Sequence, residues 1–211
     1  MNHIKNLDVF VTPDNQGENM RLGILGGSFN PVHLGHIELA RFVMDNIPIL
    51  NEVWLMPCVH TLLGKQNIDL LHRLDMCELA CKGYDRIKTS AFEYIHSSKN
   101  THEMLSEFNK YYNNTIKPFM IIGMDEALQI QQWVDWENLI STNTFIVVDR
   151  TGFKPTKKKL WFQSAPHIYL KDKDQVLPVI SSTVIRNKEE GYKYLLRPTV
   201  LKYIEDNKLY E

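Results

Sequence analysis

The stretch "LGILGGSFNPVHLGH" (residues 22–36) joins an apolar run to two adjacent glycines and then to two histidines three positions apart. The run at 21–25 predicts a buried strand, and the segment 33–46 predicts a helix. Between them, Gly26 and Gly27 lack a Cβ, so a ligand can approach the backbone closely. The helix start adds unpaired N–H groups and a positive dipole end. We therefore expect this turn to bind an anion such as phosphate.

The rest of the chain alternates between predicted strands and helices. Strands are predicted at 52–57, 86–92, 117–125, 144–150 and 167–171. Helices are predicted at 67–83, 100–114, 126–140, 181–191 and 197–207. This alternation predicts an α/β fold, a doubly wound and mostly parallel sheet with a small helical part at the C-terminus. We expect an N-terminal arm over residues 1–20 and a single domain over 21–211.

The composition limits which binding partners and which cellular compartment we expect. The 211 residues include 24 Lys and Arg against 25 Asp and Glu, so no overall field recruits nucleic acid or an anionic membrane. The N-terminus has no signal-peptide pattern, and no window is apolar enough for a membrane span. Three cysteines, Cys58, Cys77 and Cys81, include no CxxC pair, which disfavours a disulfide framework or a zinc site. We expect a cytoplasmic protein in which Cys77 and Cys81 lie on a buried helix face.

The two histidines admit several chemical roles. The opening stretch contains neither GxGxxG nor GxxxxGK[ST], which disfavours a dehydrogenase or a kinase-type phosphate loop. His33 and His36 are expected on one face at the helix start, beside the phosphate-ready turn. Imidazoles there can donate hydrogen bonds, carry positive charge or attack phosphorus. Metal ligation is the lesser alternative, because a third protein ligand is missing.

A second motif supports a specific family. "GGSFNPVHLGH" resembles the signature of the HxGH nucleotidyltransferases, in particular the nicotinate and nicotinamide mononucleotide adenylyltransferases. "ISSTVIR" (180–186) is similar to the ISSTxxR motif of that family. Its residue types fit phosphate binding: Ser182 and Thr183 offer hydroxyls at a helix start, and Arg186 offers a guanidinium fork. Alternatively, Ser181 is only a helix cap and Arg186 only a surface charge.

The resemblance extends over most of the chain and implies a Rossmann-like nucleotidyltransferase fold. "IIGMDEALQIQQWVDWENL" (121–139), "FIVVDRTG" (145–152) and the closing "YLLRPTVLKYIEDNKLY" are similar to the bacterial, nicotinate-preferring branch. The implied catalytic residues are His33, His36 and Arg186. The implied ATP-binding residues are Gly26, Gly27, Ser28, Phe29, His36, Gly123, Asp125, Ser182, Thr183 and Arg186. The implied mononucleotide-binding residues are Asn30, Thr101, Trp133 and Arg150.

Each implied role has a simpler alternative, and the chain also departs from the family pattern. Asp125 could cap a helix, Trp133 and Trp136 could be core aromatics, and Arg150 could form a surface ion pair. After the second strand the chain keeps Pro57 but places His60 and Lys65 at irregular spacing. Where relatives tend to read TxDTL, this chain reads "THEML". We therefore expect a mononucleotide pocket of somewhat different shape.

The reaction implied is transfer of AMP from ATP to nicotinate mononucleotide, which gives deamido-NAD and pyrophosphate. Because the attacking phosphate is already ionised, catalysis reduces to alignment and charge neutralisation. Mg²⁺ is expected to be held mainly by the ATP phosphates, with no protein metal site. The alternatives are nicotinamide mononucleotide as acceptor, a cytidylyl- or phosphopantetheine-type transferase, and a non-catalytic nucleotide-binding module. The sequence leaves the oligomeric state open.

Overall fold

The computed structural model describes residues 19–59, 67–149, 152–153 and 160–211. Its strands form one six-stranded sheet in the order β3-β2-β1-β4-β5-β6, and every neighbouring pair is parallel. The strands are β1 (Met20–Gly27), β2 (Glu52–Pro57), β3 (Ile87–Thr89), β4 (Ile116–Gly123), β5 (Thr144–Val148) and β6 (Ile168–Leu170). The predicted doubly wound α/β fold is confirmed.

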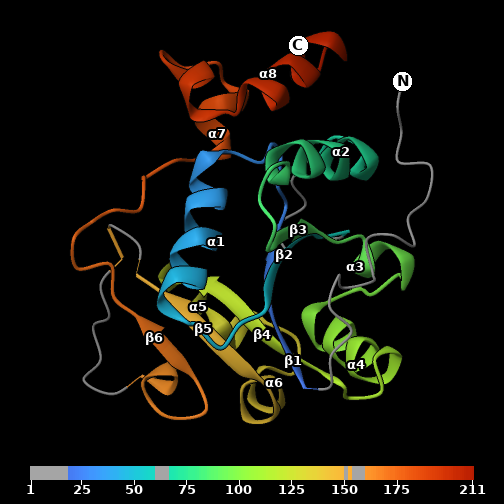
Figure 1. The fold of residues 1–211 in the computed structure, drawn as a ribbon, viewed down its shortest axis with the longest axis vertical. Coiled ribbons are helices and arrows are strands. Elements are labelled where there is room, and N and C mark those ends of the chain that lie inside the picture. The colour runs from blue at the N-terminus through green and yellow to red at the C-terminus, as the bar shows by residue number, and fades with distance from the viewer. Residues whose placement is uncertain (1–18, 60–66, 150–151, 154–159) are drawn as a thin grey trace.

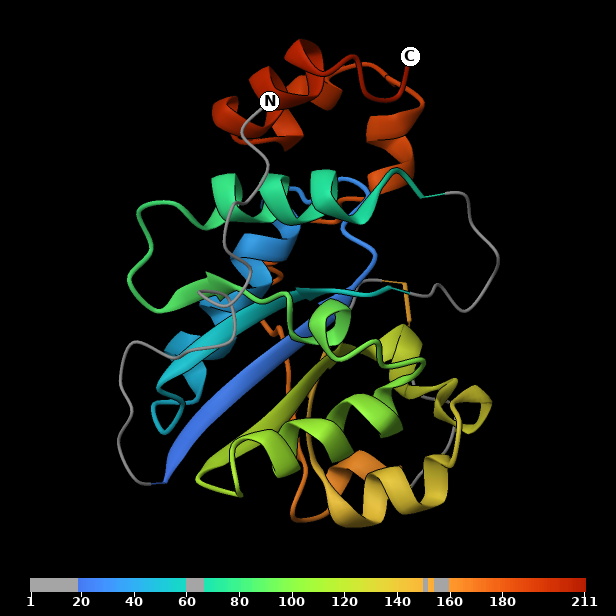
Figure 2. The same ribbon diagram turned by 90° about the vertical axis from the view of Figure 1, so that its right-hand side faces the viewer.

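Helices cover both faces of the sheet (Figures 1 and 2). One side carries α1 (Leu34–Asn46) and α2 (Leu70–Cys81), with α7 (Ser182–Arg186) and α8 (Pro198–Asp206) stacked beyond them. The other side carries α3 (Phe92–Ile95), α4 (Thr101–Tyr111), α5 (Met124–Ala127) and α6 (Trp136–Thr142). Short 3₁₀ turns lie at η2 (Ile130–Gln132), η3 (Trp161–Gln163) and η4 (Tyr192–Leu195).

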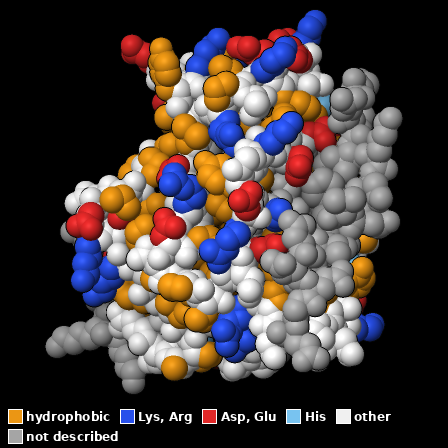
Figure 3. All heavy atoms as spheres, in the orientation of Figure 1, with side chains coloured by type: hydrophobic (Ala, Val, Ile, Leu, Met, Phe, Trp, Pro, Cys, Tyr) orange, Lys and Arg blue, Asp and Glu red, His pale blue; other side chains and the backbone are white. Residues whose placement is uncertain are grey.

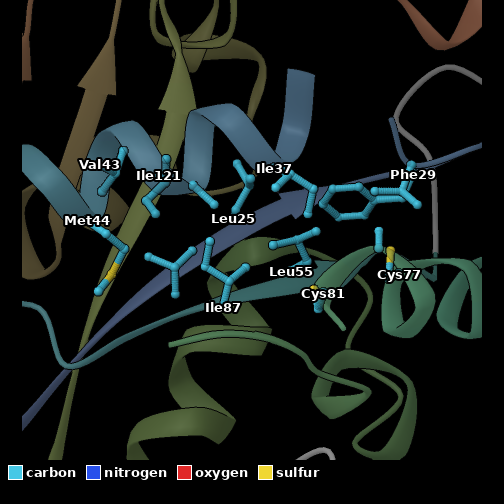
Figure 4. Close-up of a cluster of buried hydrophobic side chains, with 14 of the residues drawn as sticks. Leu25, Phe29, Ile37, Val43, Met44, Leu55, Cys77, Cys81, Ile87 and Ile121 are labelled. Atoms are coloured by element: carbon cyan, nitrogen blue, oxygen red, sulfur yellow. The ribbon is translucent and has the colours of Figure 1, made fainter. Parts of the chain in front are cut away.

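Each face of the sheet has its own apolar core. Side chains alternate along a strand, so Leu22 and Ile24 of β1 join the α3–α6 core while Leu25 joins the α1–α2 core. Figure 4 shows the second of these, where Leu25 and Phe29 meet side chains of α1 and α2. Cys77 and Cys81 lie in this core, which confirms their prediction as small buried hydrophobic residues. The C-terminal helices therefore pack on the same core as the first motif.

The prediction of one helix over residues 126–140 is wrong. The chain forms α5, then η2, and only then α6. Trp133 is extended, and Asp135 adopts a left-handed φ of 52°, which an α-helix does not accommodate. Val134, which would continue the buried stripe of Ala127 and Ile130, is 55% exposed. The helical spacing of apolar residues continues in the sequence through Val134, but the backbone leaves the helix before that position, so the pattern alone did not show the break.

Two other segments are shorter than predicted. The strand expected at 86–92 ends at Thr89 and leads directly into α3. The helix expected at 181–191 ends at Arg186, and a Gly191 φ of 78° then starts η4. Glycine adopts this left-handed conformation without steric cost, and so it marks the end of the helical segment.

Positive and negative side chains are interspersed over the face shown in Figure 3, in keeping with the nearly balanced composition. Within the described ranges, no helix has both the length and the apolar character needed to cross a membrane. The predicted arm over residues 1–20 lies outside the described residues, apart from its last two residues. The lysine-rich stretch "KPTKKK" (residues 154–159) also lies outside them.

Candidate active site

The strand order places a site at the centre of the sheet. From β1 the chain moves outward to β2 and β3, then returns to β4 on the other side of β1. At such a reversal the loops after two adjacent strands diverge and leave a crevice beyond their carboxyl ends. Gly26 and Gly27 at the end of β1 and Gly123 at the end of β4 line one cavity at this edge. Two cavities open there.

The histidines form a stacked pair at the start of α1. His33 is the N-cap residue, and its ring centroid lies 3.7 Å from that of His36 at an interplanar angle of 27°. The backbone N–H of His33 donates to His36 Nδ1 at 3.2 Å. Because Nδ1 accepts this bond, a neutral His36 carries its hydrogen on Nε2. The ring of Phe29 stands edge-on to His36 at 4.8 Å. His36 is thus oriented as a hydrogen-bond donor through Nε2.

Gly35, between the two histidines, leaves space for the His33 ring. A Cβ added at Gly35 would lie 3.1 Å from His33 Nδ1 and 3.4 Å from Ile180 Cβ. The first of these distances is shorter than an ordinary van der Waals contact, so a larger residue would displace the ring or the neighbouring segment. The absence of a side chain at this position therefore allows the histidine stack.

The second motif is hydrogen-bonded directly to the first. Ser181 caps α7 by accepting the Thr183 N–H at 3.2 Å, as one alternative for this residue predicts. Ser182 Oγ donates to the Pro31 carbonyl at 2.9 Å, across 151 positions of sequence. Arg186 is not a free surface charge, since Nη1 donates to the Asn30 carbonyl at 2.8 Å and Nη2 donates to Thr183 Oγ1 at 3.1 Å. Tertiary structure thus joins the two motifs into one site.

The first cavity, which we call the histidine cavity, has a volume of about 380 Å³. It is lined by most of the predicted ATP-binding and catalytic residues: Gly26, Gly27, Ser28, His33, His36, Gly123, Asp125, Ser182, Thr183 and Arg186. Phe29 does not line this cavity; it is 1% exposed and its ring contacts His36, which does. The structure therefore brings these residues together, while their individual roles remain predictions.

The second cavity, the tryptophan cavity, has a volume of about 410 Å³ and lies on the α4 side. Thr101 and Trp133 line it, together with apolar side chains that include Met56 and Met120. Such walls suit a flat aromatic ligand. The two cavities share the backbone of Gly26–Ser28 and the side of Glu126. A ligand in each would meet its neighbour at the glycine turn.

Of the residues predicted to bind the mononucleotide, Thr101 and Trp133 line the tryptophan cavity, whereas Asn30 does not. Asn30 lies in the wall of the histidine cavity and is 2% exposed. Its side chain is bonded to Asn67 and Tyr210, at 2.9 and 2.8 Å. Arg150 lies outside the described residues, as do His60 and Lys65.

Sequence reasoning missed Arg73, a buried cation beneath the glycine turn. Arg73 is 2% exposed, and Nη1 donates to the carbonyls of Ser28 and Cys58 at 2.8 Å each. It ties together the segments that follow β1 and β2 and places a positive charge near the predicted phosphate site. The sequence did contain a signal for a buried arginine. Arg73 lies four residues before Cys77, on the apolar face of α2, where an arginine is rarely buried unless it is paired.

Glu93 was also missed. It lines the tryptophan cavity, and its Oε1 accepts the Val59 N–H at 2.8 Å. Burial raises the pKa of the Glu93 carboxyl to about 7, while the Val59 hydrogen bond and the Arg73 charge lower it. A carboxyl in this state titrates near neutral pH. Glu93 lies on a helix of only four residues that follows a short strand. Such a segment is too short to show an apolar periodicity, so the sequence gave no sign that this carboxyl is buried.

Comparison with known proteins agrees with this geometry. Residues 24–188 match the model of the cytidylyltransferase-like family. A protein of Methylacidiphilum infernorum named "Probable nicotinate-nucleotide adenylyltransferase" is 35% identical over 199 residues, which cover 91% of this chain and 93% of that protein. A protein of Borreliella burgdorferi with the same name is 35% identical over 197 residues, covering 90% and 97%.

A solved structure supports the fold. Nicotinic acid mononucleotide adenylyltransferase of Plasmodium falciparum, complexed with NaAD, superposes with a TM-score of 0.78 at 22% identity, covering 91% of this chain and 98% of that one. The fold, the linked motifs and the family match define the class as a cytidylyltransferase-like nucleotidyltransferase. Within that class, the chain belongs to the nicotinate-nucleotide adenylyltransferase family. The family predicted from the two motifs is thereby confirmed.

Proposed function

We propose that this enzyme transfers the AMP group of ATP to nicotinate mononucleotide, forming deamido-NAD and releasing pyrophosphate in NAD biosynthesis. The observation that carries the proposal is the meeting of two cavities at Gly26–Ser28. One contains the two imidazoles, the Arg186 guanidinium and hydroxyl groups beside several carboxylates, and the other contains apolar side chains and Trp133. A triphosphate fits the first and a pyridine mononucleotide the second. The names of the relatives support the same reaction.

The triphosphate would lie in the histidine cavity. We assign His36 Nε2–H as a donor to the α-phosphate, because its other ring nitrogen already accepts a backbone hydrogen bond. His33 and Arg186 would hold the β- and γ-phosphates and stabilise the leaving pyrophosphate. The phosphate oxygen of the mononucleotide attacks the α-phosphorus, and the bond to the bridging oxygen of pyrophosphate breaks. No protein base is needed, since the attacking phosphate is ionised near neutral pH.

The mononucleotide would lie in the tryptophan cavity. We assign Trp133 to stack on the pyridine ring and Thr101, the first residue of α4, to contact the ring substituent. Arg150, which lies outside the described residues, would also contact the mononucleotide, as the resemblance implies. The nicotinate carboxylate needs donors only, whereas an amide also needs an acceptor, so the groups around the ring decide between the two substrates.

Mg²⁺ would accompany ATP. It supplies charge neutralisation of the triphosphate when bound. Among the described residues, no three His, Cys, Asp or Glu side chains form a metal-binding group, so phosphate oxygens would supply most of its ligands. Asp172 lies in the wall of the histidine cavity, and both of its carboxylate oxygens accept backbone N–H groups, from Val176 and Leu177.

We place the reaction in the cytoplasm. The three free cysteines support this compartment, because disulfides are rare there.

The decisive experiment compares turnover of the two mononucleotides with ATP and Mg²⁺, measured as pyrophosphate release. We expect kcat/KM for nicotinate mononucleotide to exceed that for nicotinamide mononucleotide by at least about tenfold, the effect of one unmatched polar group. A reversed preference would replace the acceptor in the proposal. No pyrophosphate with either acceptor, while cytidine triphosphate or a phosphopantetheine acceptor is turned over, would contradict it.

A covalent nucleotidyl-histidine route makes a different stereochemical prediction. Two successive displacements retain configuration at phosphorus, whereas direct attack inverts it. With ATP carrying an α-phosphorothioate of defined configuration, the proposed direct transfer gives inversion in the product.

A further inference from the structure

The end of the chain contacts the first motif. Tyr210, the penultimate residue, donates its phenol hydrogen to Asn30 Oδ1 at 2.8 Å, across 180 positions of sequence. Nδ2 of the same amide donates to Asn67 Oδ1 at 2.9 Å. Asn30 is 2% exposed, so both of its amide atoms are fixed inside the protein. Tyr210 thereby restrains the turn between the paired glycines and His33.

The backbone of Asn30 anchors Arg186. Arg186 Nη1 donates to the Asn30 carbonyl at 2.8 Å, and its second bond, to Thr183 Oγ1, lies within α7 itself. The bond to Asn30 is therefore the one that ties the guanidinium to the first motif. Because one residue carries both bonds, the position of the amide held by Tyr210 also sets the position of the carbonyl that orients Arg186.

Tyr210 is held in place by the docking of α8 on α2. Arg197 Nη1 donates to the carbonyls of Ala80 and Lys82 at 2.7 Å each, which binds the start of α8 to the end of α2. Tyr203 Oη donates to Asp75 Oδ2 at 2.6 Å from the middle of α8. Burial raises the pKa of Tyr210 well above its usual value, so the phenol stays a neutral donor across the physiological range.

We propose that Tyr210 is a positioning residue for adenylyl transfer, which acts through Asn30 to set the Arg186 guanidinium against the triphosphate. The inference rests on the proposed function for the reaction that it serves. Tyr210 lines neither cavity and bonds to an amide that is 2% exposed. Small misplacements of a phosphate-binding group are costly for rate, because catalysis here consists of alignment and charge neutralisation.

The first test removes a single hydroxyl. Tyr210→Phe should lower kcat/KM for ATP about three- to tenfold, the effect of one lost hydrogen bond. The KM for nicotinate mononucleotide should change less than about twofold, because neither Asn30 nor Arg186 lines the tryptophan cavity. The matched control is Tyr203→Phe, which removes a bonded phenol from the same C-terminal region. The two Arg197 hydrogen bonds still hold α8 on α2 in this variant, so it should lower the unfolding midpoint and leave the kinetics for both substrates unchanged.

A double-mutant cycle tests whether the effect passes through Arg186. Arg186→Lys removes the guanidinium fork that bonds to Asn30. In that background Tyr210→Phe should reduce kcat/KM for ATP by less than about twofold, because the group it positions is already gone. An equal loss in both backgrounds, or wild-type ATP kinetics in Tyr210→Phe, would overturn the proposal.

A binding measurement separates this inference from the proposed function. Calorimetry with an ATP analogue that has a methylene group between the α- and β-phosphorus atoms requires no acceptor. Tyr210→Phe should bind it about three- to tenfold more weakly, and Tyr203→Phe should bind it as wild type does. A wild-type protein that binds the analogue without turning over nicotinate mononucleotide would overturn only the proposed function. Unchanged binding in Tyr210→Phe would overturn only the positioning role.

Discussion

At the scale of single residues, the site depends on a backbone hydrogen bond that orients the His36 ring. The His33 N–H occupies Nδ1 of His36, which leaves Nε2–H of the neutral ring as the donor. The ring also stacks on His33 and meets the edge of Phe29. These three contacts fix the direction of the donor before any ligand binds, which is the condition for electrostatic stabilisation of a developing charge.

Loss of this donor should lower kcat strongly. We expect His36→Ala to reduce pyrophosphate release about 10²- to 10³-fold, the usual cost of removing one preorganised donor. The control is His72→Ala, because His72 Nδ1 lies 2.8 Å from the Tyr203 hydroxyl and the ring does not line either cavity. Wild-type turnover in His36→Ala would show that this ring does not act on the α-phosphate.

Glu93 should make stability depend on pH in a defined direction. Its folded pKa of about 7 lies above the usual value of 4.5, so folding favours the protonated carboxyl. Between these values the native state binds more protons than the unfolded state, and its stability falls as pH rises. Glu93→Gln cannot ionise and lacks this decline.

Urea unfolding at two pH values measures the effect. Below the usual carboxyl pKa, both proteins carry a neutral side chain and should have similar free energies of unfolding. At pH 8 we expect Glu93→Gln to be more stable than wild type, on the order of 1–2 kcal/mol after allowance for partial solvent screening. A difference that is the same at both pH values would rule out titration of Glu93 as its source.

At the scale of elements, the start of α1 combines a helix terminus with a site. The helix begins at Leu34, directly after His33, and Gly35 occupies its first turn. Alanine would be the better helix former by about 1 kcal/mol. The chain instead has glycine where a Cβ would press on His33 Nδ1 at 3.1 Å. Space for the imidazole therefore outweighs helix propensity at this position.

Adding one methyl group at each of two glycines should separate an effect on the active site from an effect on packing inside the sheet. Gly35→Ala should lower kcat/KM for ATP about tenfold or more while the free energy of unfolding changes by less than about 1 kcal/mol. Gly23→Ala places a Cβ 2.9 Å from Ile121 Cδ1 and from Val53 Cγ2 inside the sheet. It should lower stability by about 1–3 kcal/mol with little effect on kcat. Parallel kinetics and urea unfolding distinguish the two, and an active Gly35→Ala would contradict the steric account.

At the scale of the whole molecule, the site joins parts that are distant along the chain. The glycine turn and histidines come from the first quarter of the sequence, while α7 comes from near its end. Ser182 and Arg186 connect them through the carbonyls of Pro31 and Asn30. A ligand that binds both parts stabilises their association, and by mass action it stabilises the folded state.

ATP should therefore raise the unfolding midpoint. At about 100 times its Kd, ATP adds about 2.7 kcal/mol to the free energy of unfolding. For a chain of this size that corresponds to a shift of about 5–10 °C in a thermal scan. At the same ATP concentration, Arg186→Ala should lose most of this shift, because the β- and γ-phosphates lose a charge-assisted contact. An undiminished shift would place Arg186 outside the ATP site.

The sequence by itself determined the order of elements and the chemical types in the site. Strict alternation of apolar runs with helical stripes defined the doubly wound sheet, and two short motifs identified the family. These features are local, since glycine conformation, helix starts and apolar periodicity act within a few residues. The same local rule failed at 126–140, where the apolar spacing continues but Asp135 turns to a φ of 52° and the helix is broken.

Only the tertiary structure decided which groups meet. It sorted the predicted residues into two cavities, buried Asn30 under Tyr210, and placed Arg73 and Glu93 behind and beside the glycine turn. None of these contacts has a sequence period, because each joins segments whose distance is set by sheet order and helix packing. The hydrogen bond from Arg186 to Asn30, for example, joins residues that only the packed fold brings together. The physical reason is that long-range contacts follow from the packed fold, whereas local conformation follows from neighbouring residues.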